Sequence, residues 1–238
     1  MTLEGTNTYL LGAADSTELV VVDPGPEGHP QHLEAILEAA GDQRIGLILV
    51  THRHGDHVGG AAALAEATGA PVRAYDAAQC SGAEQLRVGE RLSAGGVDVV
   101  VLHTPGHTSD SVCFWLPGPN AMITGDTILG RGTTMVDYPD GTLTDYLASL
   151  DQLGHHPDAH LLPAHGPAGA PLGEVVTQYR EHRQQRLDQV TGLLAEHGDL
   201  DAEQVARLIY GEDQAVHNRV LVMIAAAQLD HILHLRGE

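Results

Sequence analysis

The sequence contains no lysine, and its 12 basic residues are all arginines set against 32 acidic residues. The formal net charge at pH 7 is therefore −20. A surface this acidic repels phosphate backbones, which argues against a nucleic-acid partner. Three arginines, Arg180, Arg183 and Arg186, are spaced as on one helix, and we expect them to form an ordinary solvated face.

Aromatic residues make up only 3% of the chain, so we expect a core built from Val, Leu, Ile and Ala. Two cysteines, Cys80 and Cys113, are too few for a disulfide framework, and no signal-peptide pattern is visible at the start. Both observations predict a cytoplasmic protein. No apolar run reaches the roughly 20 residues that span a bilayer, so no membrane partner is expected.

The 238 residues suit one mixed α/β domain followed by an appendage. Alternating and apolar patterns predict strands at 6–11, 19–23, 45–51, 71–74, 97–103, 111–116, 121–124 and 160–166. Helical spacing predicts helices at 30–40, 58–68, 143–153, 174–196, 201–210 and 216–235. Because the strand signal disappears after residue 171, we divide the chain into a domain at 1–170 and a helical domain at 171–238.

One hexapeptide, residues 52–57, concentrates potential metal ligands directly after a predicted buried strand. It contains His52, His54, Asp56 and His57. Such a cluster in one loop costs desolvation and mutual repulsion unless a cation neutralises it. The hexapeptide therefore predicts a metal site, held between the strand before it and the helix after it.

Three further candidates, His107, Asp126 and His165, each follow another predicted strand. Together with the hexapeptide they make seven potential ligands, which is enough for two metal ions. Imidazole and carboxylate suit zinc, and the absence of cysteine from the set leaves iron and manganese open.

Four motifs in order, His-x-His-x-Asp-His, Thr-Pro-Gly-His-Thr, Thr-Gly-Asp and Pro-Ala-His-Gly, resemble the metallo-β-lactamase-fold superfamily. The resemblance implies an α/β (α+β) protein with a four-layer αββα sandwich, here followed by a small all-helical C-terminal appendage. It also implies that His52, His54 and His107 hold one metal. Asp56, His57 and His165 would hold the second metal, with Asp126 bridging both and Asp23 supporting the ligand loop from behind.

Further motifs, such as Gly-Thr-Asn-Thr-Tyr-Leu at 5–10 and Tyr-x-x-His-Arg-x-x-Arg at 179–186, are similar to the β-lactamase-like protein 2 group. That group carries a winged-helix-like domain after the hydrolase domain. Its members include an endoribonuclease, and related enzymes are thioesterases that release polyketides from carrier proteins. No strand pattern follows residue 235, so we expect a truncated, purely helical form of that domain.

These features predict a hydrolase in which a hydroxide between two divalent ions, most simply Zn²⁺, attacks a small or carrier-bound ester, thioester or lactone. Asp126 and Asp56 would be the catalytic carboxylates, and either Asp56 or a metal-bound water could relay the proton to the leaving group. A metal-dependent endoribonuclease or phosphodiesterase is the alternative, since the group resemblance and the three arginines on 180–186 favour it. A non-hydrolytic di-iron or metal-binding module is a second alternative.

A glycine-rich loop directly after Asp126 is expected to face the substrate, because loops at strand ends line such sites. It contains Arg131, Thr133 and Thr134, which we predict to contact the substrate. Arg131 could pair with a substrate carboxylate or phosphate.

Overall fold

Two β-sheets form the centre of the molecule in the computed structural model, which describes residues 5–212, 214 and 218–237. The first sheet has the order β1 (Tyr9–Leu11), β2 (Glu18–Val22), β3 (Arg44–Leu49) and β4 (Val72–Arg73), with β1 antiparallel to β2 and the other pairs parallel. The second sheet runs β5 (Arg91–Ala94), β6 (Val97–His103), β7 (Val112–Leu116), β8 (Ala121–Gly125) and β9 (His160–Pro163). Only β9 pairs in parallel there, alongside β8.

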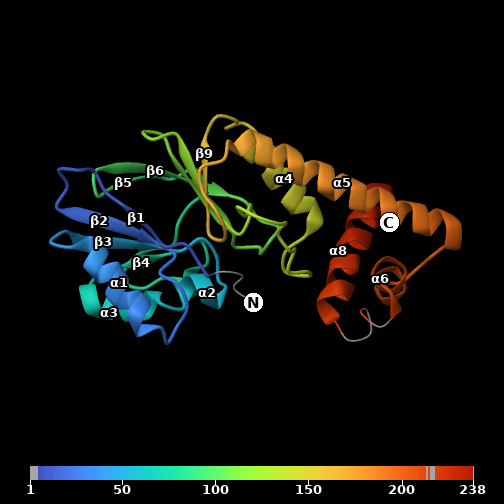
Figure 1. Ribbon diagram of the computed structural model, residues 1–238, viewed down its shortest axis with the longest axis horizontal. Helices are drawn as coiled ribbons and strands as arrows, with labels where there is room; N and C mark the ends of the chain where they lie inside the picture. The colour runs from blue at the N-terminus through green and yellow to red at the C-terminus, as the bar shows by residue number, and fades with distance from the viewer. Residues whose placement is uncertain (1–4, 213, 215–217, 238) are drawn as a thin grey trace.

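Helices cover the outer faces of both sheets (Figure 1). Helices α1 (Pro30–Ala40) and α3 (Ala61–Thr68) pack on the first sheet, and α4 (Leu143–Leu153) and α5 (Leu172–His197) pack on the second. One hydrophobic cluster lies under each helical layer and a third lies between the sheets. This arrangement is the αββα sandwich, so the expected fold class is confirmed.

Strand β2 shows how the sequence builds these layers. Successive side chains of a strand point to opposite faces, and here Leu19 and Val21 enter the cluster under α1 and α3. Val20 and Val22 enter the cluster between the two sheets. The strand is buried on both faces, which explains its unbroken apolar run.

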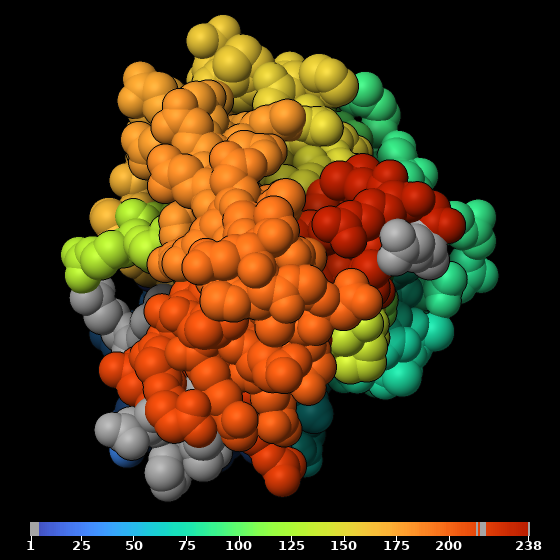
Figure 2. All heavy atoms as spheres, turned by 90° about the vertical axis from the view of Figure 1, so that its right-hand side faces the viewer, coloured from blue at the N-terminus to red at the C-terminus, as the bar shows by residue number. Residues whose placement is uncertain are grey.

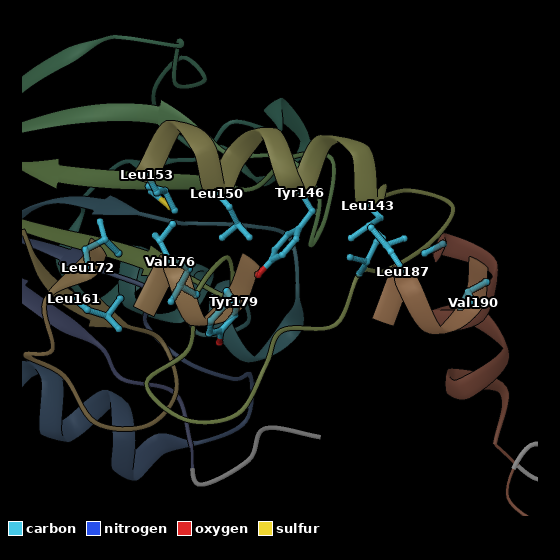
Figure 3. Close-up of a cluster of buried hydrophobic side chains, with 14 of the residues drawn as sticks. Leu143, Tyr146, Leu150, Leu153, Leu161, Leu172, Val176, Tyr179, Leu187 and Val190 are labelled. Atoms are coloured by element: carbon cyan, nitrogen blue, oxygen red, sulfur yellow. The ribbon is translucent and has the colours of Figure 1, made fainter. Parts of the chain in front are cut away.

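Helix α5 begins beside α4 and continues into the appendage. In Figure 3, Tyr146 and Leu150 of α4 point toward Val176 and Tyr179 of α5. All four are buried in one cluster, which also contains residues of the appendage. The boundary proposed near residue 170 stays a prediction, since this cluster includes side chains from both sides of it.

The appendage consists of the second half of α5 together with α6 (Ala202–Tyr210) and α8 (Arg219–Arg236), which pack on one another. These helices form the face seen in Figure 2, with α5 and α6 in orange and α8 in red. A capping box between Asp201 and Gln204 starts α6. Residues 216 and 217, where a helix was expected to start, lie outside the described residues. Within the described part of 172–237 there is no strand, as expected for an appendage without a wing.

Two local predictions were wrong. The helix expected at 58–68 is two helices, α2 (Gly55–Val58) and α3, because the chain passes very close to the turn after β2. A Cβ on Gly59 would lie 2.4 Å from the backbone nitrogen of Glu27, and one on Gly60 would lie 2.5 Å from the carbonyl oxygen of Pro24. The edge strand β5 was missed, since its side chains alternate only between exposed and half-buried positions.

The helices of the described residues include none with the length and hydropathy that crossing a membrane requires.

Candidate metal centre

The seven residues predicted as metal ligands come together beyond the ends of β3, β6, β8 and β9. Three groups of them have candidate ligand atoms within 4.8 Å of one another, and the groups share members. They are His52, His54 and His107; His52, His57 and Asp126; and Asp56, His57 and His165. The first and third groups are the two sets that the family resemblance implied, although their role as metal ligands stays a prediction.

The first group is made of three imidazoles. Nδ1 of His54 lies 3.1 Å from Nε2 of His52 and 3.0 Å from Nε2 of His107. Burial and the neighbouring imidazoles lower the pKa of His52 well below its usual value. Its ring is therefore neutral at pH 7 and presents a lone pair, which is the form that binds a metal.

The side chain of Asp126 lies between the first group and the third. One carboxylate oxygen lies 3.5 Å from Nε2 of His57 and 3.3 Å from Nε2 of His165, both of the third group. The other oxygen faces the first group, 3.7 Å from Nε2 of His107. The remaining member of the third group is Asp56, whose Oδ2 lies 3.3 Å from Nε2 of His165. Asp126 thus has the position that a bridging ligand needs.

Imidazoles and carboxylates of opposite charge lie close together around the third group. Burial acts to lower the pKa of His57, but the carboxylates of Asp23 and Asp126 outweigh it and raise that pKa to about 10. Burial likewise acts to lower the pKa of His165, but Asp126 and Asp56 raise it to about 10. Burial acts to raise the pKa of Asp126, but the nearby imidazoles of His165 and His57 lower it far below the usual range.

Two buried atoms in this cluster, Nε2 of His57 and Oδ1 of Asp126, have no hydrogen-bond partner among the described residues. Buried polar atoms of this kind are costly unless something else satisfies them. A divalent cation would satisfy both atoms, because it would displace the proton from Nε2 of His57 and accept lone pairs from this nitrogen and from the carboxylate oxygen. The donor set of five imidazoles and two carboxylates fits such ions.

The second nitrogen of two of the imidazoles is held by a backbone carbonyl from outside the cluster. Nδ1 of His107 donates to the carbonyl oxygen of Met135 at 2.6 Å, and Nδ1 of His165 donates to that of Gly5 at 2.8 Å. A carbonyl can only accept, so these bonds fix the tautomer and turn Nε2 toward the cluster. Outer partners of this kind are typical of histidines that bind metals.

Asp23, which the family resemblance placed behind the ligand loop, contacts the hexapeptide and the residue before it. Its buried carboxylate accepts from the backbone nitrogen of Thr51 at 2.8 Å, from the hydroxyl of Thr51 at 2.7 Å and from Nδ1 of His57 at 2.8 Å. The Thr51 hydroxyl in turn lies 3.1 Å from Nδ1 of His52. One carboxylate therefore orients two of the candidate ligands.

Replacing Asp23 by asparagine is expected to weaken metal binding by about 10- to 100-fold. The amide nitrogen of the asparagine would face a hydrogen-bond donor, either Thr51 or Nδ1 of His57. That buried donor would lose its acceptor, which is expected to lower the free energy of unfolding by about 1–3 kcal/mol. Competition with a chromophoric chelator measures the affinity. Asp98→Asn, at an exposed position of β6, is the matched control, and equal affinities of the two variants would contradict the assignment.

A further set of residues, which the sequence did not suggest, surrounds His54. Its Nε2 lies 3.4 Å from Oδ2 of Asp137, and the guanidinium of Arg53 donates to the same carboxylate oxygen at 2.8 Å. Arg53 also contacts Asp110 and Asp140. Thus Arg53, between two candidate ligands in the hexapeptide, ties their loop to the segment 137–140. Nothing in the spacing of these acidic residues indicated that role.

The residues of the predicted substrate loop differ in their exposure to solvent. Arg131 and Thr133 are exposed, whereas Thr134 is buried. The hydroxyl of Thr134 donates to the backbone oxygen of Asp126 at 2.7 Å, so it holds the segment that carries the central carboxylate. Contact of the three residues with a substrate stays a prediction.

The expectation that Arg180, Arg183 and Arg186 share a solvated face was wrong. Only 7% of Arg183 is exposed, and its guanidinium lies 4.9 Å from the ring centre of Tyr146 while donating to the carbonyl of Thr134. Arg180 is exposed and pairs with Asp151. The middle arginine is buried against residues of the first domain, so the three do not make a surface stripe for nucleic acid.

The two sheets with their helices, and the histidine and aspartate cluster at their ends, define a metallo-β-lactamase fold. The profile of the Metallo-beta-lactamase superfamily matches residues 1–165, and the chain belongs to this superfamily. It is 31% identical over 220 residues to the Beta-lactamase-like protein 2 homolog of Caenorhabditis elegans, an alignment that covers 89% of this chain and 72% of that protein. The predicted resemblance to that group is confirmed.

Two other proteins extend the comparison. The Atrochrysone carboxyl ACP thioesterase of Aspergillus chevalieri is 32% identical over 225 residues, which cover 92% of this chain and 70% of the relative. The crystal structure of a metallo-beta-lactamase family protein from Thermus thermophilus superposes with a TM-score of 0.80 at 23% identity. The superposition covers 98% of this chain and 89% of the other, and shows that the fold extends through the appendage.

Proposed function

We propose that the protein is a dinuclear metal-dependent hydrolase that cleaves a small or carrier-bound acyl ester, thioester or lactone. The observation that carries the proposal is the position of Asp126, whose two carboxylate oxygens face different groups of candidate ligands. A single carboxylate between two ligand sets is what a bridged pair of ions requires. Binding of two metal ions, chemistry on them and the substrate class all belong to the proposal.

In this proposal His52, His54 and His107 hold one ion, and Asp56, His57 and His165 hold the other. Two divalent ions there would supply a Lewis acid for the substrate oxygen and lower the pKa of a shared water toward 7. Zn²⁺ is the proposed ion, because the donor set is imidazole and carboxylate and zinc imposes little geometric preference.

The protein's own task is to hold these side chains without reorganisation during the reaction. Asp23 and the carbonyls of Met135 and Gly5 fix three imidazole rings, so their orientation is set before the substrate arrives. Asp56 is half-buried at the edge of the cluster. Its carboxylate is the group we propose to carry a proton from the attacking water to the leaving atom.

The choice of an acyl substrate over a phosphodiester has two supports. The net charge of −20 disfavours RNA, whose binding usually needs several phosphate contacts. The burial of Arg183 also means that the three arginines that motivated the nuclease alternative do not form one exposed stripe along which an RNA backbone could lie. A thioester on a carrier is favoured further by the name of the Aspergillus relative, an ACP thioesterase.

Metal removal tests the hydrolase. Protein as purified is expected to contain about two zinc ions per chain and to hydrolyse members of an acyl ester and thioester panel. Dialysis against a chelator should abolish turnover, and adding Zn²⁺ back should restore it. Elemental analysis and absorption spectroscopy measure the metal. Iron with a visible absorption band would favour the di-iron alternative, and two-zinc protein inactive on the whole panel would contradict the acyl assignment.

A further inference from the structure

A pocket of about 220 Å³ lies between the predicted substrate loop and the appendage. The loop segment 133–135 forms one wall of the pocket, and helices α5, α6 and α8 form the others. The lining residues are Thr133, Thr134, Met135, His182, Arg183, Arg186, Tyr210, Ile224 and Gln228. Helices α5 and α8, which form two of these walls, lie side by side in Figure 2.

The charge of this pocket is opposite to that of the protein. Its described lining contains two of the 12 arginines and one histidine but no carboxylate, in a chain with 32 acidic residues. Within the described part of the chain, Arg183 and Arg186 form no ion pair; Arg186 donates instead to the neutral side chain of Gln189 at 2.8 Å. Partial burial and the positive charges of these two arginines lower the pKa of His182.

Two buried polar atoms in the lining have no partner among the described residues. They are Nε of Arg183 and Oε1 of Gln228, on side chains only 7% and 3% exposed. Leaving such atoms unsatisfied is unfavourable, so a ligand that enters the pocket and supplies both kinds of partner would be stabilised by them. Nε is a donor suited to an anionic oxygen, and Oε1 is an acceptor suited to an N–H or O–H group.

The peptide unit that joins Thr134 and Met135 lies between the pocket and the metal cluster. The carbonyl of Thr134 accepts from Arg183 on the pocket side, whereas the carbonyl of the next residue, Met135, accepts from His107 on the cluster side. The hydroxyl of Thr134 also holds the backbone of Asp126. The pocket therefore lies close to the cluster, on the outer side of His107, and a long flexible arm that is anchored in the pocket could reach the reacting centre.

We propose that this pocket binds the phosphate of a phosphopantetheine arm whose acyl thioester is cleaved at the metal cluster. A phosphate suits the arginine pair, and the amide N–H and hydroxyl groups of pantetheine suit Oε1 of Gln228. This inference rests on the proposed function, because a phosphopantetheine arm is part of the substrate only if that substrate is a carrier-bound thioester. In this proposal Arg186 is the residue that distinguishes a phosphorylated arm from an unphosphorylated one.

Binding without turnover tests the pocket separately from the reaction. The probes are S-methyl phosphopantetheine and S-methyl pantetheine, which differ only in the phosphate and carry no free thiol to bind a metal. With the zinc-loaded protein, calorimetry is expected to show at least about tenfold tighter binding of the phosphorylated probe. Arg186→Gln should remove most of this difference, and Gln228→Leu should weaken both probes.

Arg180→Gln is the matched control, because it removes the same charge from the same helix outside the pocket lining. It should keep the tenfold preference. In hydrolysis, acyl-phosphopantetheine should show a raised KM and an unchanged kcat in Arg186→Gln, while acyl-pantetheine should show no change.

Equal binding of the two probes to the wild-type protein would overturn the pocket assignment, even if thioesters are hydrolysed. So would equal losses in Arg180→Gln and Arg186→Gln, which would indicate only a general charge effect. Tight binding of a single-stranded RNA with no binding of either probe would overturn it in favour of a phosphodiester ligand. Phosphate-dependent binding with no hydrolysis of any ester, thioester or lactone would instead refute the proposed function and leave the pocket's affinity for the phosphorylated arm supported.

Discussion

Asp126→Asn is expected to reduce hydrolysis by on the order of 10³-fold or more, the largest effect of any single substitution that we foresee. Asparagine keeps the shape of the side chain but loses the charge, and only one of its two terminal atoms can bind a cation. The first and third ligand groups would then no longer share a carboxylate, although His57 and His165 would still face each other in the third group.

The metal content of Asp126→Asn separates this explanation from simple misfolding. We expect it to fall from about two ions per chain toward one, while circular dichroism stays that of the wild type. Asp158→Asn, at an exposed position just before β9, should keep both the metal and the activity. Full activity of Asp126→Asn would refute the bridged centre, and with it the hydrolase mechanism.

Gly106→Ala is expected to cause the largest loss of stability, about 3 kcal/mol or more. A Cβ at this position would lie 2.3 Å from Cα and 2.5 Å from the backbone nitrogen of Tyr146, so helix α4 itself would have to move. Gly106 also has φ = +134°, a conformation that residues with side chains rarely adopt. Since His107 is the next residue, the same shift would displace a candidate ligand.

Thermal unfolding of Gly106→Ala should show a Tm lowered by about 10 °C. Gly118→Ala is the matched control, because a Cβ there meets nothing within 4 Å. We expect its Tm to stay within a degree or two of the wild type. A Gly106→Ala protein as stable as this control would mean that the packing of the loop against α4 contributes little.

Prediction from the sequence succeeded where one local pattern decides the outcome. The helix at Pro30–Ala40 and the strand at Val97–His103 have the predicted bounds, because a proline start, helical spacing and a β-branched run are contained in the segments themselves. The seven candidate ligands could be named for a related reason. Each follows a strand, and the ends of neighbouring strands meet at one edge of the molecule.

The partners of these ligands could not be foreseen, since they depend on contacts between distant segments. The carbonyl that holds His165 belongs to Gly5, 160 residues away, and any residue type would supply the same carbonyl. The burial of Arg183 had no signal either, because it is Tyr146 on another helix that provides the surface over which the guanidinium lies. Helical spacing alone could place Arg183 on one face of α5, but it does not indicate which residues of other elements cover that face.

The division of the two sheets along the chain has a consequence for the order of folding. The first sheet uses only residues 9–73 and the second only residues 91–163, so each can assemble from contacts within its own half of the chain. The hexapeptide belongs to the first half, whereas His107, Asp126 and His165 belong to the second. Closing the loop between His52 and His165 must await the docking of the two halves. Metal binding would then follow folding, and bound metal would stabilise the folded protein rather than initiate its folding.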